Sequence, residues 1–400
     1  MAPRHQRTHG RRKFLAALGG VAVGAPAAAV IAPHALAGTT SRTTAATAAD
    51  TLPLTIVNNT GSFGNASVHV YIVGNRDGRQ VRVTPEGTLA PIAVSDNGAD
   101  GFTDYAIPLA GSGETRLSLP RMSGRIYVSL GQKLKLRAVT DGAGNPALQY
   151  PAGWVSSDPN YPVLHDCAEF TYNASGMFCN TTMVDMFSVP LSIRLTGARD
   201  QTTGTLRDGG RAAAFAAVRQ AEGFGKLVVD DTRVIAPGHG LDAGLFAKDY
   251  FAPYIDEVWS TYTGKDLTVA TAAGTFTGRV RGGKLTLAGP AAVSFDRPST
   301  RDVLFCDGAL AAPNDGTTGP VAAVLGAGFN RSTLLASAAQ PVTDASSFYR
   351  TAVTNHYAAA MHAATADGRA YGFAFDDVAD FASYIQDTAP TDIRLTLTPF

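Results

Sequence analysis

Short stretches of alternating apolar and polar residues dominate the first half of the chain. The alternation runs through residues 52–56 and resumes at residues 68–72, after the turn-forming run Asn-Asn-Thr-Gly at 58–61. A period of two places the apolar side chains on one face of a β-strand. Similar runs lie at residues 116–119, 125–128 and 133–136. Up to about residue 200, this spacing predicts an all-β domain, either a barrel or a sandwich.

The middle of the chain has a different pattern. Residues 210–221 are strong helix formers without a breaker, and apolar residues recur at helical spacing between residues 250 and 262. Three short strands are then expected at residues 267–270, 275–280 and 284–287, with Gly282-Gly283 as a tight turn. These elements together predict a separate unit that contains both helices and strands.

The last part of the chain returns to strand patterns. A helix is expected from Asn355 to about Ala366, and strands are expected at residues 370–375 and 392–397. A β pattern at both ends, with an α+β unit between them, predicts that the middle domain is inserted into the β domain. We therefore expect the β domain at residues 52–205 and 341–400, with the insertion at residues 206–340.

The N-terminus carries the pattern of an export signal. Arg11 and Arg12 precede an apolar run rich in Ala and Gly, which ends at the small-residue spacing Ala-Leu-Ala at 35–37. Paired arginines before a weakly hydrophobic core are typical of the twin-arginine signal, which carries folded proteins. The alternative is a membrane anchor, but glycines and prolines interrupt the run. We expect cleavage after Ala37, a flexible leader at residues 38–51 and a secreted mature protein.

Charge and cysteine content restrict the partners and the cross-links. Residues 1–37 hold five of the 33 basic residues and none of the 33 acidic residues, so the mature chain is mildly acidic, at about −5. The mature chain has no basic tract, which argues against nucleic acid, and no second apolar segment that could span a membrane. Cys167 and Cys179 could form a bridge and leave Cys306 free. A tight hairpin at residues 174–175 would instead place the first two on opposite faces, and both arrangements stay open.

Several catalytic motifs are missing. The sequence has no H-E-x-x-H, C-x-x-C or G-x-S-x-G, which argues against zinc proteases and α/β-hydrolases. Gly142-Ala143-Gly144 precedes no helix pattern and is expected to be a loop, not a dinucleotide site. The five histidines of the mature chain show no metal-ligand spacing. Each of them is expected to be a surface or core residue and not a metal ligand.

Carboxylates are the remaining candidates for chemistry. Glu169 and Asp185 each lie inside a strand-like run, where an acid is disfavoured unless it is paired or faces water. On neighbouring strands the two would line a polar cleft, and their polar neighbours could hold sugar hydroxyls. Those neighbours are Thr171, Asn173, Asn180 and Thr182. The alternative is that both acids point into solvent on the outer face of a half-buried sheet.

The region around these acids resembles glycoside hydrolase family 64, secreted β-1,3-glucanases that release laminari-oligosaccharides. The resemblance covers essentially the whole mature chain. Its motifs, in order, lie at residues 123–127 (SGRIY), 157–160 (SDPN), 184–188 (VDMFS), 312–315 (APND), 328–331 (GFNR), 355–357 (NHY) and 371–377 (YGFAFDD). The resemblance implies a mainly β fold with α+β parts: a thaumatin-like β-barrel or sandwich, an inserted smaller α/β domain and a wide groove between them.

The resemblance also implies roles for the two acids. Glu169 matches the general acid of an inverting mechanism and Asp185 matches the general base, so no metal is required. Thr171, Asn173 and Thr182 match positions that contact the sugar in the family. Phe178 stands where a Trp is expected, and it can stack on a sugar ring without the indole N–H donor. Cys167 also stands where an aromatic residue is usual.

Two acids near the C-terminus complete the implied site. Asp376 and Asp377 are expected to add negative potential to the cleft, although Asp at the end of a strand is often a turn residue.

Two functions follow from these observations. The first is a secreted, endo-acting β-1,3-glucanase that cleaves laminarin, fungal-wall or storage glucan with inversion. We expect it to be a monomer, which is the default oligomeric state. The second is a non-catalytic, thaumatin-like protein that binds β-glucan, because a fold alone does not fix a function. The presence of both acids favours the enzyme.

Overall fold

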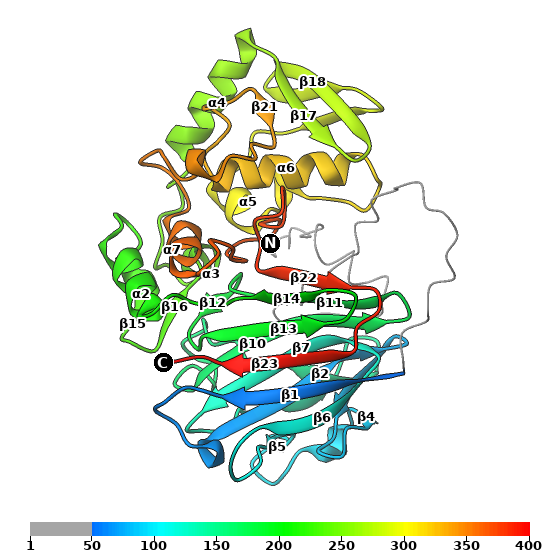
Figure 1. Ribbon diagram of the computed structural model, residues 1–400. Coiled ribbons are helices and arrows are strands. Elements are labelled where there is room, and N and C mark those ends of the chain that lie inside the picture. The colour runs from blue at the N-terminus through cyan, green and yellow to red at the C-terminus, as the bar shows by residue number, and fades with distance from the viewer. Residues whose placement is uncertain (1–49) are drawn as a thin grey trace, which may run out of the picture. The chain divides into compact units, whose positions relative to one another are not determined.

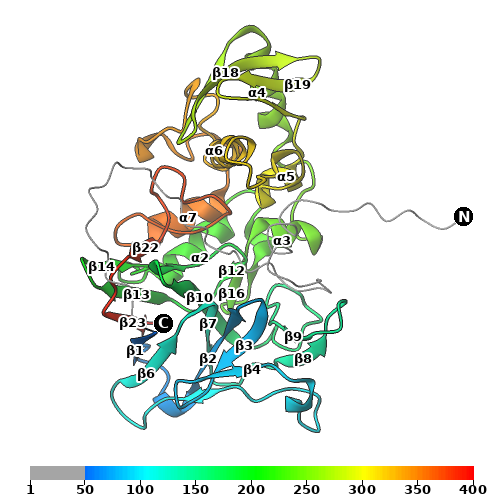
Figure 2. The ribbon, with the colours of Figure 1, turned by 90° about the vertical axis from the view of Figure 1, so that its right-hand side faces the viewer.

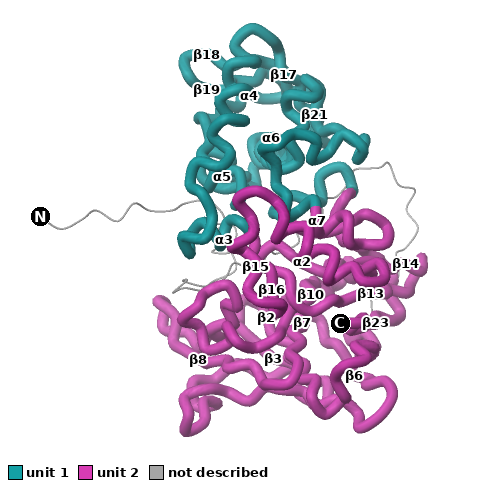
Figure 3. Tube along the Cα trace, turned by 90° about the vertical axis from the view of Figure 1, so that its left-hand side faces the viewer, with its two compact units in different colours: residues 1–18, 237–359, 373–380 teal, residues 19–236, 360–372, 381–400 magenta. Residues whose placement is uncertain are grey.

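The computed structural model describes residues 50–400, which form two compact units (Figure 1, Figure 3). Unit 2 contains residues 50–236, Ala360–Gly372 and Phe381–Phe400, and unit 1 contains Pro237–Ala359 and Phe373–Asp380. The chain thus leaves unit 2 twice, after Ala236 and after Gly372, and returns to it at Ala360 and at Phe381. The predicted signal peptide and nearly all of the leader lie outside the described residues. The domain limits expected from the sequence, at residues 206 and 341, differ from these unit limits and remain predictions.

Unit 2 is built on two large sheets. The five-stranded sheet has the order β14-β13-β23-β1-β6. Its strands are β1 (Thr51–Asn58), β6 (Thr115–Pro120), β13 (Leu191–Thr196), β14 (Asp200–Thr203) and β23 (Asp392–Leu397). The eight-stranded sheet has the order β22-β11-β10-β7-β2-β3-β4, with β5 paired to β2. Its strands are β2 (Val68–Arg76), β3 (Arg79–Val83), β4 (Leu89–Pro91), β5 (Ile107–Pro108), β7 (Met122–Leu130), β10 (Leu164–Asn173), β11 (Gly176–Thr181) and β22 (Tyr384–Asp387).

The main core of unit 2 lies between these two sheets. Alternate side chains of β1, such as Leu54 and Ile56, join Val70 and Ile72 of β2 and Leu395 of β23 in one buried cluster. The alternation seen in the sequence is therefore the alternation between this core and the outer faces. The prediction of a mainly β domain is confirmed, and its form is a sandwich.

Smaller elements complete unit 2. They are the hairpin β8 (Arg137–Thr140) and β9 (Pro146–Gln149), the sheet of β12 (Met186–Phe187), β15 (Val228–Val229) and β16 (Arg233–Ile235), the helix α2 (Gly210–Gln220), and the 3-10 helices Asn65–Ser67, Val94–Asp96 and Gly225–Leu227. A second buried cluster, which includes Tyr71, Tyr127 and Leu148, lies on the outer face of the eight-stranded sheet. Part of that face is therefore covered by the chain between residues 92 and 163.

Unit 1 combines one sheet with helices (Figure 2). The sheet has the order β20-β19-β18-β17-β21, and helices α4 and α6 pack against it. The strands of this sheet are β17 (Leu267–Thr271), β18 (Gly274–Arg281), β19 (Lys284–Ala288), β20 (Ala292–Phe295) and β21 (Ala339–Gln340). The α-helices of the unit are α3 (Pro237–Asp242), α4 (Ala252–Gly264), α5 (Thr300–Phe305) and α6 (Thr318–Asn330), and its 3-10 helices are Gly308–Leu310 and Ala345–Ser347. Trp259 of α4 stacks on Phe329 of α6, with 6.3 Å between ring centroids. The predicted α+β character of this region is confirmed.

Helix α7 (His356–Ala364) confirms the helix expected near residue 355, but two predicted strands are absent. Residues 133–136 are irregular, although Leu134 and Leu136 are buried as their alternation suggests. Side chains satisfy the backbone there, because the Leu134 N–H donates to the Tyr71 hydroxyl and the Lys135 N–H donates to Asn160 Oδ1. Residues 370–375 form turns, with one isolated bridge at Tyr371. In these segments apolar residues alternate because their side chains are buried in turn, although the backbone does not pair as a strand.

Among residues 50–400, none of the helices is long and apolar enough to cross a membrane.

Candidate active site

The predicted site residues of β10 lie on the outer face of the eight-stranded sheet, which we call the site face. Ala168, Phe170 and Tyr172 enter the core between the sheets. Because side chains alternate along a strand, Glu169 and Thr171 point to the opposite, site face. The strand is central in its sheet, with β7 on one side and β11 on the other. Glu169 is consequently 3% exposed, in a strand paired along both edges.

Register places two polar partners beside Glu169. Arg125 of β7 and Asn180 of β11 are its direct neighbours in the sheet. Arg125 donates to Glu169 Oε1 from Nε at 3.1 Å and from Nη2 at 2.8 Å. Asn180 Nδ2 donates to the other oxygen, Oε2, at 3.3 Å. The acid is therefore buried with a charged partner and an amide, as a buried carboxylate requires.

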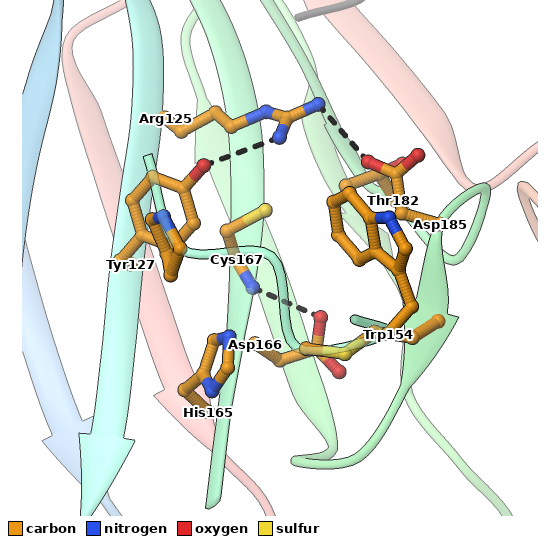
Figure 4. A pocket seen from close by; sticks show the side chains of 10 residues that line it. Arg125, Tyr127, Trp154, His165, Asp166, Cys167, Thr182 and Asp185 are labelled. Carbon is orange, nitrogen blue, oxygen red and sulfur yellow. Dashed lines mark hydrogen bonds and ion pairs between the residues drawn. The ribbon is translucent and has the colours of Figure 1, made fainter. Parts of the chain in front are cut away.

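Asp185 reaches the same guanidinium from a different part of the chain. Its Oδ2 lies 3.4 Å from Arg125 Nη2 (Figure 4). The same nitrogen also contacts Glu169. The predicted strand position of Asp185 is wrong, because the residue lies in a bend directly before β12. Its carbonyl accepts the Ala236 N–H at 3.1 Å, which fixes the bend to the end of β16. The Asp185 side chain is 19% exposed, against 4% for Glu169.

A pocket opens beside these groups. It is lined by Arg125, Tyr127, Pro151, Trp154, His165, Asp166, Cys167, Thr182, Asp185 and Met186. Figure 4 shows the Trp154 indole close to Thr182 and Asp185, with Tyr127 and Cys167 on the side of Arg125. Aromatic faces beside charged and hydroxyl groups are suited to sugar rings, which have apolar faces and polar edges.

Asp166, which also lines the pocket, connects β10 to the segment that carries Asp185. Its Oδ2 accepts the N–H groups of Ser188 and Val189 at 2.8 and 3.2 Å, and its Oδ1 accepts the Cys167 N–H at 3.0 Å. Ser188 directly follows β12, so these bonds hold the strand next to Asp185. Burial raises the pKa of Asp166 to about 7, while the three N–H donors oppose that rise. Burial also lowers the pKa of the neighbouring His165 to about 4.

Comparisons with known proteins match this architecture. The family model of glycoside hydrolase family 64, described as beta-1,3-glucanase, matches residues 50–397. The chain belongs to glycoside hydrolase family 64. The predicted family is thus confirmed over the whole described part of the chain.

Individual family 64 proteins resemble the chain along its length. The glucan endo-1,3-beta-glucosidases of Arthrobacter sp. (strain YCWD3) and Cellulosimicrobium cellulans are both 35% identical to it over 413 residues, which is 99% of this chain and 72% of each relative. A laminaripentaose-producing β-1,3-glucanase, solved in complex with laminaritetraose, has a TM-score of 0.80 and 37% identity, covering 88% of this chain and 99% of its own. A β-1,3-glucanase domain from Clostridium beijerinckii has a TM-score of 0.77 at 28% identity over the same shares.

Four further residues predicted for the family 64 site also belong to unit 2. Thr171 pairs in register with Phe178 of β11, so both lie in the row next to Glu169 and Asn180. Thr182 lines the pocket. Asn173 ends β10, where its Oδ1 accepts the Ser175 N–H of the hairpin turn at 2.7 Å. These positions stay predictions as sugar contacts.

Asp376 and Asp377 belong to unit 1, in the turn that follows Phe373. Asp376 is fully buried, and its Oδ1 accepts Arg331 Nη2 at 3.0 Å. The same guanidinium donates to the carbonyls of Asp376 and Val378 at 2.7 and 2.8 Å. This turn agrees with the alternative reading of the two acids as turn residues. The described contacts give Asp376 a structural partner inside its own unit.

All three cysteines are buried, and none of them forms a disulfide. Phe170 pairs with Cys179 in register, so the β10–β11 hairpin is the tight one. Cys167 therefore lies on the site face and Cys179 in the core between the sheets, which excludes the bridge considered from the sequence. Residues 50–400 also contain no group of three His, Cys, Asp or Glu side chains that could hold a metal ion.

Sequence reasoning missed Arg125, Tyr127 and Trp154 as members of the site. Arg125 and Tyr127 belong to the SGRIY motif that supports the family resemblance, but no role was attached to them. The sequence did contain a signal for Arg125, because this arginine lies in a run predicted to be a strand. A charged side chain in a buried strand requires a partner of opposite charge or hydrogen-bond acceptors. Trp154 lies in an irregular segment, where no periodicity marks it.

Proposed function

We propose that the chain is an endo-acting glycoside hydrolase that cleaves β-1,3-glucan to laminari-oligosaccharides. The observation that carries the proposal is the contact of Glu169 and Asp185 with one nitrogen of Arg125, beside a pocket with aromatic walls. The names of the relatives support the substrate, since two are glucan endo-1,3-beta-glucosidases and one solved neighbour holds laminaritetraose. No metal or organic cofactor is needed for a reaction that uses two carboxyl groups.

Glu169 acts as general acid and Asp185 as general base in this proposal. Asp185 is the more exposed carboxylate, which suits the group that must receive an attacking water. Glu169 is fixed by Arg125 and Asn180, which suits the group that must keep its position against the glycosidic oxygen.

Inversion sets a condition on the distance between the two groups. Inverting pairs are separated by roughly 6.5 to 9.5 Å, so that a water fits between sugar and base. The facing oxygens lie closer than this, because they contact one nitrogen at 2.8 and 3.4 Å. Whole carboxyl groups are farther apart than their facing oxygens, and Asp185, which lies in a bend, can adjust its position to water and substrate more readily than a residue of a central strand could.

The remaining predicted residues would hold the sugar. Thr171, Asn173 and Thr182 offer hydroxyl and amide groups for sugar hydroxyls, and Phe178 offers a ring face. Asp377 would add negative potential, whereas Asp376 is already neutralised by Arg331. We propose one chain acting on a neutral polysaccharide, without nucleic acid or membrane as partner.

Hydrolysis of laminarin tests the enzyme against the alternative of a glucan-binding protein. Glu169→Gln and Asp185→Asn should each lower reducing-sugar release by roughly 10²- to 10⁴-fold, because each removes one proton-transfer group. Glu257→Gln, an exposed change on α4, is the matched control and should keep full activity. Binding of laminarin by the wild type without any release would support the binding protein instead.

The stereochemical part of the proposal has its own measurement. Proton NMR of the first product should show the α-anomer from a β-linked substrate, if Asp185 activates water directly. A β-anomer as first product would mean a covalent intermediate, which overturns the assignment of Asp185 as general base but not the hydrolysis.

The mature enzyme is proposed to be exported through the twin-arginine signal at residues 11–12. This proposal rests on the local sequence alone.

A further inference from the structure

One buried guanidinium faces both reacting carboxylates. Arg125 is 4% exposed and lies on β7, directly opposite Glu169 of β10. Its Nε and Nη2 contact Glu169, its Nη2 also contacts Asp185, and its Nη1 donates to the Tyr127 hydroxyl at 3.1 Å. All three guanidinium nitrogens thus have partners in the site.

We propose that Arg125 is a positioning residue that holds the Glu169 and Asp185 carboxylates together and sets the pH range in which the pair works. This inference rests on the proposed function of the two acids. Arg125 would act through them, by charge and by geometry, without itself transferring a proton.

The charge argument follows from the groups around Arg125. Tyr127 on the same strand, Tyr150 after β9 and Cys167 on β10 face it as well, and burial raises the pKa of each, so all three are neutral at ordinary pH. Asn180 on β11 is uncharged. The local balance is therefore one cation against two carboxylates, in surroundings where charges interact more strongly than in water. Without the cation, two facing negative charges would remain, and the pair would take up a proton more readily.

The geometric argument follows from the shape of the guanidinium. Its planar fork places two donors on Glu169 Oε1 while the third nitrogen bonds Tyr127, whose ring stacks on Tyr150 at 6.2 Å between centroids. The backbone of Arg125 is thus fixed in the sheet, and its guanidinium is fixed by the Tyr127 hydroxyl. A lysine would keep the positive charge but lose the fork.

The experiment compares the pH dependence of kcat/KM on laminarin for the wild type, Arg125→Met and Arg125→Lys. In an acid–base mechanism, the acidic limb reports the base and the alkaline limb reports the acid. Easier proton uptake moves both limbs to higher pH, and we expect a shift of about one to two pH units for Arg125→Met. Arg125→Lys should keep both limbs within about 0.3 pH unit but lower kcat by roughly 10- to 100-fold with little change in KM, because a misplaced acid loses transition-state stabilisation.

The outcomes separate this inference from the proposed function. A folded Arg125→Met with both limbs at the wild-type pH would overturn the inference while Glu169→Gln still shows that the acid is required. If Arg125→Met does not fold, the test rests on Arg125→Lys. A wild-type kcat in this variant would contradict the role given to the guanidinium fork. A limb displaced by more than about 0.5 pH unit would contradict the role given to the positive charge. A purely structural arginine would lower the amount of folded enzyme and leave the profile of the remaining enzyme in place. Circular dichroism and thermal melting measure the folded fraction of each variant.

Discussion

At the scale of single residues, Asp166 is a second buried carboxylate close to the proposed acid and base. Asp166 lines the pocket and accepts three backbone N–H groups, two of which belong to residues that follow β12. The bonds favour its charged form and burial opposes it. Burial prevails and raises the pKa of Asp166 to about 7, from an ordinary value of 3.8. The anchor of the Asp185 segment therefore titrates in the range where many enzymes work.

The sign of its effect on stability follows from this shift. The folded state binds the Asp166 proton more tightly than the unfolded chain, so the contribution is fully present below about pH 3.8 and is lost as the pH rises towards 7. We expect the free energy of unfolding of the wild type, relative to Asp166→Asn, to fall across that window by at most about 1.4 kcal/mol per pH unit. Urea denaturation at several pH values measures it. A difference between the two proteins that stays constant from pH 4 to 7 would contradict the raised pKa.

At the scale of elements, the backbones of strands β2 and β7 lie very close to each other next to Arg125. Gly74 and Gly124 are opposite each other in register. A Cβ at Gly124 would lie 2.2 Å from the Val73 carbonyl oxygen, and one at Gly74 would lie 2.1 Å from the Ser123 carbonyl oxygen. Backbone atoms cannot yield as a flexible side chain can, so any larger residue must displace a strand.

Gly124→Ala should therefore affect both stability and activity. We expect a loss of roughly 1–3 kcal/mol in the free energy of unfolding, as for other overpacked sites. A loss of activity larger than the loss of folded protein should accompany it, because the next residue, Arg125, moves with β7. Gly111→Ala is the matched control, since a Cβ there meets nothing within 4 Å. Equal melting temperatures and equal activities of the two variants would show that β7 tolerates the displacement.

At the scale of the whole molecule, the last strand completes the first sheet. β23 lies between β1, with which it is parallel, and β13, with which it is antiparallel (Figure 1). Residues from all three strands share one core. The sandwich of unit 2 therefore cannot close until residues 392–397 have been synthesised. The three buried thiols also fit a protein that folds where cysteines stay reduced.

Both features agree with export of the protein after folding, which is what a twin-arginine signal requires. Replacing Arg11 and Arg12 by lysine should reduce the activity recovered outside the cell by at least about 10-fold and leave active enzyme inside. Deleting residues 392–400 should abolish active enzyme in both places, since the core of unit 2 is left open. Activity assays of culture medium and cell extract compare the two. Undiminished export of the double lysine variant would contradict the proposed route.

Local pattern in the sequence determined several elements of this protein. The helices α2 and α4 and the strands β17–β19 were expected close to where they lie, because helix propensity, apolar spacing and tight turns act between near neighbours. Alternation likewise identified β1, β2, β6, β7 and β23 of the sandwich, and a strand-like run placed Glu169 in β10. The family, and with it the pair Glu169 and Asp185 as candidates, followed from motifs along the chain.

Only the tertiary structure decided how those residues meet. Asp185 lies in a bend and not in a strand, and the thiols of Cys167 and Cys179 point to opposite faces. Arg125 contacts both acids from β7, the strand next to the one that carries Glu169. Arg125 and Asp185 are 60 positions apart, so no short-range pattern could join them. Register between β7 and β10 places Arg125 beside Glu169, and register is selected by the burial of the whole sheet. The bend that is fixed to the end of β16 brings Asp185 to the same guanidinium. Both acids were candidates from the sequence alone, whereas the cation that they share was set by packing.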